Sequence, residues 1–392
     1  MSAPIRVLFH VQHLLGIGHQ VRAAAIARAM QAEGLSVWFV DGGLDAPRTD
    51  IGGARHIRLP GARTADVSFS RLVDADGREV DESWRRHRVQ ALLEAYDQAR
   101  PDVVLIESFP FARRQFRFEL LPLLHRAEGE AAIAVSIRDI LVRKDKPART
   151  KEVLDLVAGH VDRVLVHGSP DIASLDLSFP AAAEFADRTV YTGYVDGGPA
   201  PGTADTSTTG EIVVSAGGGA AGGPLLRAAA AVAASAAGPG PRWRFLIGPN
   251  LPEEDRAALV SLPGTVTVEP ARPDFRSLLS GAALSISQAG YNTIVDLAQT
   301  GCRSLLVPFA APGETEQAMR AALLEKRGWA NVLPEESLAP EALMTAIGHA
   351  LAKPAPGPWP IDTAGAQKTA KCVAVMGRLQ RGGGRASLGA MP

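Results

Sequence analysis

The sequence predicts an α/β protein of two doubly wound domains, and three observations support that prediction. A short apolar strand, a glycine-rich turn and a helix occur between residues 5 and 33 and again from residue 211 onward. A stretch rich in Gly, Pro, Ser and Thr separates the two halves. Between residues 282 and 308 the chain adds a strand, a glycine turn, a helix and a second strand, which is the repeating unit of a parallel sheet.

Length and composition limit the classes of protein to which this chain can belong. Its 392 residues, 46% hydrophobic and 21% charged, suit a soluble protein of two domains. A net charge of -1 argues against a nucleic-acid-binding protein. The two cysteines, Cys302 and Cys372, form neither a disulfide framework nor a metal-ligand pattern. With no signal-like region and no apolar run of membrane-spanning length, we expect a cytoplasmic protein, with peripheral contact to the inner face of the membrane left open.

The same features divide the chain into segments. We expect an N-terminal domain at 1–196, a linker at 197–210 and a C-terminal domain at 211–362. A last helix at 363–380 follows a Pro-rich crossing and is expected to pack back on the N-terminal domain, and 381–392 is expected to be disordered.

The first half opens with a strand at 5–10, a glycine turn and a helix from about His19 to Glu33. Gly16 and Gly18 lack the third glycine of a dinucleotide fingerprint, and His19 stands at the helix start instead. A helix amino end disfavours the imidazolium form, so His19 is either a general base near pH 7 or a residue that only caps or packs. Further strands are expected at 36–40, 101–106, 132–137, 163–167 and 189–192.

Polar residues follow two of these strands, at the sheet edge where ligands bind in such folds. Glu107 ends the strand at 101–106, and Arg138 and Asp139 end the strand at 132–137, as acceptor-binding residues or as a structural ion pair. Residues 108–124 interleave phenylalanines with arginines, among them Arg113. This run is either an amphipathic helix with solvated arginines, the favoured reading, or a face for an acceptor or a membrane surface.

The second half repeats the arrangement. Its glycine turn, Gly217, Gly218 and Gly219, permits either close approach to a ligand or tight helix packing. Strands are expected at 211–215, 242–247, 266–268, 282–286 and 304–308, and helices at 275–280, 316–327 and 340–352.

The most informative stretch runs from residue 285 to 320. A turn at Gln288, Ala289 and Gly290 leads into a helix that begins near Tyr291, Asn292 and Thr293, and such a helix start offers unpaired N–H groups to an anion. Asp296, one turn later, suits a ribose diol better than a phosphate. Glu316 and Gln317 follow the next strand at the same edge. The plain alternative is an ordinary βαβ unit whose polar residues only cap and solvate.

These residues resemble a known family. AGYNTIVDLAQTGCRSLLVPF together with ETEQAMRA is similar to the donor-binding segment of glycosyltransferase family 28. The resemblance implies the GT-B fold, in which two Rossmann-like doubly wound domains face each other across a cleft. GIGHQVR is also similar to the start of a nucleotide-sugar hydrolase of the same ancestry.

The resemblance assigns roles to residues. It implies that His19 is the catalytic base and that Gly290 to Thr293 hold the donor diphosphate. It places Asp296 on the ribose and Gln317 on the donor sugar. The donor-binding residues implied in full are Gly16, Gly18, Gly217, Gly218, Gly219, Gln288, Ala289, Gly290, Tyr291, Asn292, Thr293, Asp296, Glu316 and Gln317.

Three of these positions depart from the family pattern. Asp296 is shorter than the usual glutamate, Glu316 replaces a glutamine, and Arg320 replaces a smaller amide, so N-acetylglucosamine cannot be assumed as the sugar.

The function implied is an inverting, metal-independent glycosyltransferase that moves a sugar from a nucleotide-diphosphate donor, with UDP favoured, to a hydroxyl acceptor that is either soluble or lipid-linked. We expect no cofactor and no metal, and we discount the Asp74–Asp76 pair because it lies in a polar loop. A hydrolase that uses water, and a nucleotide-sugar-binding protein without catalysis, are the alternatives.

Overall fold

The computed structural model describes residues 3–14, 18–44, 49–64, 71–143, 146–198, 209–218, 220–235, 241–260, 262–264, 266–311 and 313–383. Residue contacts divide the described chain into two compact units. The first takes in residues 3–141, 146–197 and 362–383, and the second takes in 142–143 and 198–361.

The first unit is built on a seven-stranded sheet in which all neighbouring strands are parallel. The strand order is β3-β2-β1-β6-β7-β8-β9, so the chain reverses its direction of travel across the sheet between β1 and β6. The strands are β1 (Arg6–Val11), β2 (Ser36–Asp41), β3 (Arg55–Arg58), β6 (Val103–Glu107), β7 (Ala132–Arg138), β8 (Arg163–His167) and β9 (Thr189–Tyr191); β4 (Arg63–Thr64) and β5 (Leu72–Val73) form a small antiparallel pair beside it.

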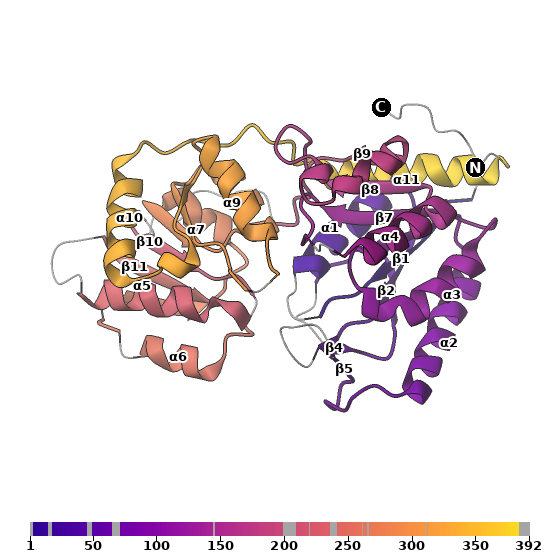
Figure 1. Ribbon diagram of the computed structural model, residues 1–392, viewed down its shortest axis with the longest axis horizontal. Helices are drawn as coiled ribbons and strands as arrows, with labels where there is room; N and C mark the ends of the chain where they lie inside the picture. The colour runs from indigo at the N-terminus through magenta and orange to yellow at the C-terminus, as the bar shows by residue number, and fades with distance from the viewer. Residues whose placement is uncertain are drawn as a thin grey trace. The chain divides into compact units, whose positions relative to one another are not determined.

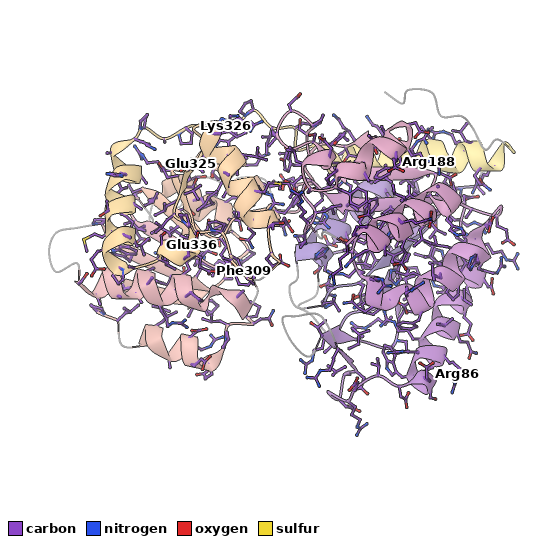
Figure 2. The ribbon with its side chains drawn as sticks, in the orientation of Figure 1. Arg86, Arg188, Phe309, Glu325, Lys326 and Glu336 are labelled. Carbon is purple, nitrogen blue, oxygen red and sulfur yellow. The ribbon has the colours of Figure 1, made fainter. Side chains whose placement is uncertain are left out.

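Alternate residues of β1 supply two hydrophobic cores because successive side chains of a strand point to opposite faces. Val7 and Phe9 pack in the core that includes residues of α1 and α11, whereas Leu8 packs in the core that includes residues of α2 and α3. The helices of this unit are α1 (Gly18–Ala32), α2 (Glu82–Ala99), α3 (Arg117–Ala127), α4 (Pro147–His160) and α11 (Gly365–Arg381). Arg188, labelled in Figure 2, donates to the carbonyl oxygens of Val157 (2.9 Å) and Val161 (2.8 Å) at the end of α4.

The last helix of the chain belongs to the first unit, as the yellow ribbon of α11 in Figure 1 shows. Its close fit to β1 requires glycine, because a Cβ on Gly377 would lie 2.3 Å from a methyl carbon of Ile5. Where the chain leaves the unit and returns to it, the two segments are hydrogen-bonded. Tyr194 N donates to Asp362 O (2.7 Å), and Gly365 N donates to Tyr194 O (2.9 Å).

Residues 108–124 are not one amphipathic helix, so that prediction was wrong for its first half. Ser108 and Arg113 adopt positive φ angles of 68° and 60°, and the Phe109–Pro110 bond is cis. A 3-10 turn follows at Arg114–Phe116, and α3 begins only at Arg117. Backbone in the left-handed region cannot continue an α-helix, which is why the helix starts late.

The second unit repeats the topology with six parallel strands, in the order β12-β11-β10-β13-β14-β15. Numbered within its own unit this is 3-2-1-4-5-6, the order of the doubly wound dinucleotide-binding fold, and the first unit adds one strand to the same series. The strands are β10 (Ile212–Ser215), β11 (Trp243–Ile247), β12 (Val266–Pro270), β13 (Leu284–Ser287), β14 (Ser304–Leu306) and β15 (Asn331–Val332).

Helices cover both faces of this second sheet as well. One core joins the sheet to α5 and α10, and the other joins it to α7, α8 and α9. The helices are α5 (Gly223–Ser235), α6 (Glu253–Val260), α7 (Phe275–Gly281), α8 (Tyr291–Thr300), α9 (Glu316–Lys326) and α10 (Pro340–Ala352). None of the described helices in either unit is long and apolar enough to cross a membrane.

Candidate active site

The first sheet brings two predicted residues together at the point where its strand order reverses. β1 and β6 are neighbours, but the chain leaves them in opposite directions, so their carboxyl ends form the topological switch point at which ligands bind in such folds. His19 stands in the first turn of α1, just after β1, and Glu107 is the last residue of β6. His19 Nδ1 lies 2.6 Å from Glu107 Oε1.

Glu107 is a buried carboxylate held in its charged form. Its side chain is 1% exposed, and Arg22, from the next turn of α1, also donates to Oε1. Burial opposes ionisation, but the hydrogen bond from His19 and the charges of Arg22 and Arg113 outweigh it and hold the pKa of Glu107 far below its usual range. The ionised carboxylate can then accept the Nδ1 proton of His19.

That hydrogen bond fixes the chemistry of His19. With Nδ1–H donated to Glu107, Nε2 carries the lone pair, and Arg138 Nη2 lies 3.4 Å from it. Burial lowers the pKa of His19 to about 3, with Arg113 and Arg138 acting in the same direction and Glu107 opposing them. His19 is therefore neutral at pH 7, with a side chain 16% exposed and an Nε2 lone pair that faces the guanidinium of Arg138.

Arg113, predicted as an acceptor residue, lies in the same cluster. Its Nε donates to the carbonyl oxygen of Gln12 (3.0 Å), just past the end of β1. Burial, together with the positive charges of Arg138 and Arg22, lowers its pKa to about 10, whereas Glu107 acts in the opposite direction. Three of the four predicted acceptor residues (Glu107, Arg113 and Arg138) thus surround His19. The fourth, Asp139, is fully buried and packs against Gly168, where an added Cβ would lie 2.6 Å from the Asp139 Cβ.

Two buried networks next to this cluster escaped the sequence analysis. In one, His167 at the end of β8 joins three strands of the sheet: its Nε2 lies 2.7 Å from Ser136 Oγ, and its Nδ1 lies 2.8 Å from Thr192 Oγ1. Burial lowers the pKa of His167 to about 3, so it too is neutral at pH 7. Its place at the carboxyl end of a predicted strand was the available signal.

The other network centres on Arg88 of α2. All five N–H groups of this buried guanidinium have acceptors, which are both oxygens of Glu119, the carbonyls of Gly42 and Pro60, and Gln12 Oε1. Arg88 therefore joins the segments that follow β1, β2 and β3. No local pattern marks it among the other arginines of its helix, because its acceptors are remote in sequence.

The second sheet reverses its order between β10 and β13, and the predicted donor residues lie there. Gly217 has a φ of 71° that favours glycine, and Asn250 Nδ2 donates to Gly218 O (2.8 Å). Gln288 Nε2 donates to Ala221 O (3.0 Å), which ties the two turns together. Gly16 and Gly219 fall outside the described residues.

The two helix starts at this edge differ in their capacity for an anion. At α5, a Cβ on Gly223 would lie 2.1 Å from a carboxylate oxygen of Asp255, so the Asp255–Arg227 ion pair already occupies the space beside that helix start. At α8, the N-cap is Gly290, which makes no side-chain capping hydrogen bond. The α8 start is thus the better place for a phosphate, because its N-cap residue is a glycine and brings no carboxylate to the positive end of the helix dipole.

The remaining predicted donor residues flank α8. Asp296 accepts from Arg276 Nε (2.7 Å). Gln317 Oε1 accepts from the backbone N–H of Phe309, which Figure 2 labels in the second unit (3.1 Å). Glu316 is buried against Arg320, with 2.8 Å between Oε1 and Nη2. The structure therefore gives Glu316 a buried ion-pair partner where the sequence analysis expected a donor contact.

Solved structures share this fold over almost the whole chain. The glycotransferase of kitacinnamycin has a TM-score of 0.63 at 16% identity, covering 97% of this chain and 98% of that one. The spinosyn rhamnosyltransferase SpnG, complexed with thymidine diphosphate, has a TM-score of 0.56 at 18% identity, covering 96% and 99%.

The sequence comparison adds the family. Residues 218–371 match the glycosyltransferase family 28 C-terminal domain. The second half of the chain therefore resembles glycosyltransferase family 28, and the chain has the GT-B fold. The matched segment contains Gly218, the α8 start and the Glu316–Arg320 pair.

A curated relative, from Agrobacterium fabrum (strain C58 / ATCC 33970), is UDP-N-acetylglucosamine--N-acetylmuramyl-(pentapeptide) pyrophosphoryl-undecaprenol N-acetylglucosamine transferase. It is 31% identical over 117 residues, which are 29% of this chain and 31% of the relative. The chain thus spans under a third of the length of this relative. The predicted resemblance and fold class are confirmed, and these findings support the prediction of a glycosyltransferase enzyme.

Proposed function

We propose that this family 28-like protein is an inverting glycosyltransferase that moves a sugar from a nucleotide-diphosphate donor, UDP in the first instance, to a hydroxyl acceptor. The observation that carries the proposal is the His19–Glu107 pair at the switch point of the first sheet. A neutral imidazole whose tautomer is fixed by a buried carboxylate is built to receive a proton.

In the proposed step, the acceptor oxygen attacks the anomeric carbon while the bond from that carbon to the diphosphate oxygen breaks. The acceptor's proton passes to His19 Nε2, and Glu107 stabilises the imidazolium that forms. The bonding electrons leave with the diphosphate, whose charge the α8 helix start stabilises. Attack opposite the leaving group inverts the anomeric centre.

We also propose that the reaction needs neither metal nor cofactor, since the positive end of the α8 dipole can supply the positive potential. The acceptor is proposed only by its hydroxyl group. We include lipid-linked acceptors as well as soluble ones because the name of the curated relative specifies an undecaprenol-linked acceptor. Cytoplasmic location, with or without peripheral membrane contact, stays a prediction.

The test begins with thermal-shift measurements on UDP-, GDP-, dTDP- and CMP-sugars, since a ligand that binds the folded protein raises its melting temperature. The donor that binds is then incubated with chelator, with and without soluble and lipid-linked alcohols. A transferase consumes donor faster when acceptor is present. Consumption that no acceptor increases identifies the hydrolase, and binding without turnover identifies a non-catalytic protein.

His19→Ala is the matched variant. We expect it to lose about 10²–10⁴-fold in kcat with nearly unchanged donor affinity, because the imidazole acts on the proton of the acceptor. His349→Ala, an exposed histidine of α10, is the control and should retain full turnover. Near-normal turnover by His19→Ala would remove the base assignment.

A further inference from the structure

The side chain of Arg320 reaches from α9 to the turn that precedes α8. Arg320 is 1% exposed, and its Nη1 donates to the carbonyl oxygen of Ala289 (2.9 Å). Its Nη2 donates to Glu316 Oε1 one turn earlier on the same helix (2.8 Å). The guanidinium therefore holds a backbone carbonyl of the turn at which the donor diphosphate is proposed to bind.

Holding that carbonyl also orients the next amide. The peptide between Ala289 and Gly290 is planar and trans, so its C=O and N–H groups point in opposite directions. With Ala289 O directed at Arg320, the N–H of Gly290 points away from α9. Glycine permits a peptide flip at low cost, and a flip would place the oxygen of Ala289 where the Gly290 N–H now points. An oxygen there would repel a phosphate.

Glu316 sets the electrostatic role of this arginine. Its carboxylate is buried with the guanidinium, with side-chain exposures of 4% and 2%, so the pair as a whole is close to neutral. A neutral pair acts on the turn through geometry more than through charge. Burial of the pair also keeps Glu316 from lying open to sugar hydroxyls.

We propose that Arg320 is a positioning residue that fixes the Ala289–Gly290 peptide so that its N–H faces the diphosphate of the donor; this inference rests on the proposed function. Arg320 does not touch the nucleoside in this scheme. Its removal should weaken the binding of the diphosphate group selectively.

The experiment measures dissociation constants for UDP and dTDP and for the matching nucleosides, uridine and thymidine, by ligand-observed NMR. Arg320→Met is expected to weaken binding of the nucleoside diphosphate about tenfold, the equivalent of one charge-assisted hydrogen bond, and to leave nucleoside binding unchanged. Glu316→Gln keeps an acceptor for Arg320 and should bind the diphosphate within about threefold of wild type. Arg327→Met, at the end of α9, is the control and should match wild type.

Arg320→Lys covers the case in which Arg320→Met does not fold, since lysine keeps the charge but not the fork of donors. It should lose at least about threefold in diphosphate affinity and none in nucleoside affinity. Unchanged diphosphate binding in the folded variants, or equal loss for diphosphate and nucleoside, overturns the inference and leaves the proposed function intact. Wild-type protein that binds neither UDP nor dTDP overturns both.

Discussion

At the scale of single residues, the protonation state of His19 results from opposing effects. Glu107 favours the imidazolium, whereas burial and the arginines Arg113 and Arg138 disfavour it, and the second group prevails. The result is an imidazole that carries no proton on Nε2 over the physiological range. In the proposed reaction, proton transfer to Nε2 then becomes favourable only as the acceptor oxygen bonds to the anomeric carbon and its proton becomes more acidic.

This balance predicts the pH profile of the reaction. A general base is active in its neutral form, and with a pKa of about 3 His19 stays neutral from pH 8 down to pH 5. We expect kcat/KM to show no acid limb from His19 over that range. Arg113→Met removes a charge that lowers the pKa of His19, so any acid limb in that variant should move to higher pH. An acid limb near pH 6.5 in the wild type would contradict the assignment.

At the scale of elements, most buried strands and the main turns were predictable, because buried parallel strands are apolar runs that end at glycine or at polar residues. The edge strands β3 and β15 were missed, since neither is an apolar run. The predicted strand at 163–167 matches β8, and the predicted helix at 340–352 matches α10. The start of α8 was equally well marked by Gly290.

Other elements carried no such mark. α2 is rich in charged residues and was missed. Its buried face includes Arg88, which donates hydrogen bonds to oxygens in three separate loops. The late start of α3 depends on Arg113, which takes a left-handed conformation and bonds the carbonyl of Gln12. A pattern read along the chain does not contain such contacts. The donor turn and His19 were found because a glycine next to a strand is a local signal.

His167, whose hydrogen bonds join β7, β8 and the end of β9, makes the free energy of unfolding of the first unit depend on pH. The folded pKa of His167 is about 3 and the unfolded value is about 6.5, so the unfolded state binds more protons below neutrality and stability falls as pH falls from about 6.5 toward 3. Between pH 7 and pH 5, the titration of His167 should lower the free energy of unfolding by about 2 kcal/mol.

The variant His167→Gln removes that titration. We expect the decrease in the first unit's melting temperature between pH 7 and pH 5 to be about 4–8 °C smaller than in wild type, as measured by calorimetry. His349→Gln replaces an exposed histidine and should keep the wild-type pH dependence. An unchanged pH dependence in His167→Gln would show that His167 is already protonated, or free to become so, in the folded protein.

At the scale of the whole molecule, the last helix closes the first unit through its final residue. Arg381 donates to both oxygens of Asp102 (2.8 and 2.7 Å) and to the carbonyls of Ala3 and Pro4 (2.6 Å each). The end of α11 is thus joined to the start of the chain and to the loop before β6. About a third of the Arg381 side chain is exposed, so solvent screens this contact.

We expect Arg381→Met to lower the melting temperature of the first unit by about 2–4 °C and to leave that of the second unit unchanged. Arg378→Met, an exposed arginine of the same helix, should change neither. Calorimetry at low and high salt is the measurement, and the shift should shrink as salt increases. Equal effects of the two variants would mean that α11 is held by its apolar face alone.

The backbone hydrogen bonds between Tyr194 and residues 362 and 365 place the exit and the re-entry of the chain side by side. In the sequence, residues 198–361 are therefore an insertion in the first unit. If they were removed, a short bridge would rejoin the two ends of the first unit. Such an architecture lets a lineage exchange the second unit while keeping the first. It also gives the protein engineer a natural pair of junctions for grafting one sugar specificity onto another.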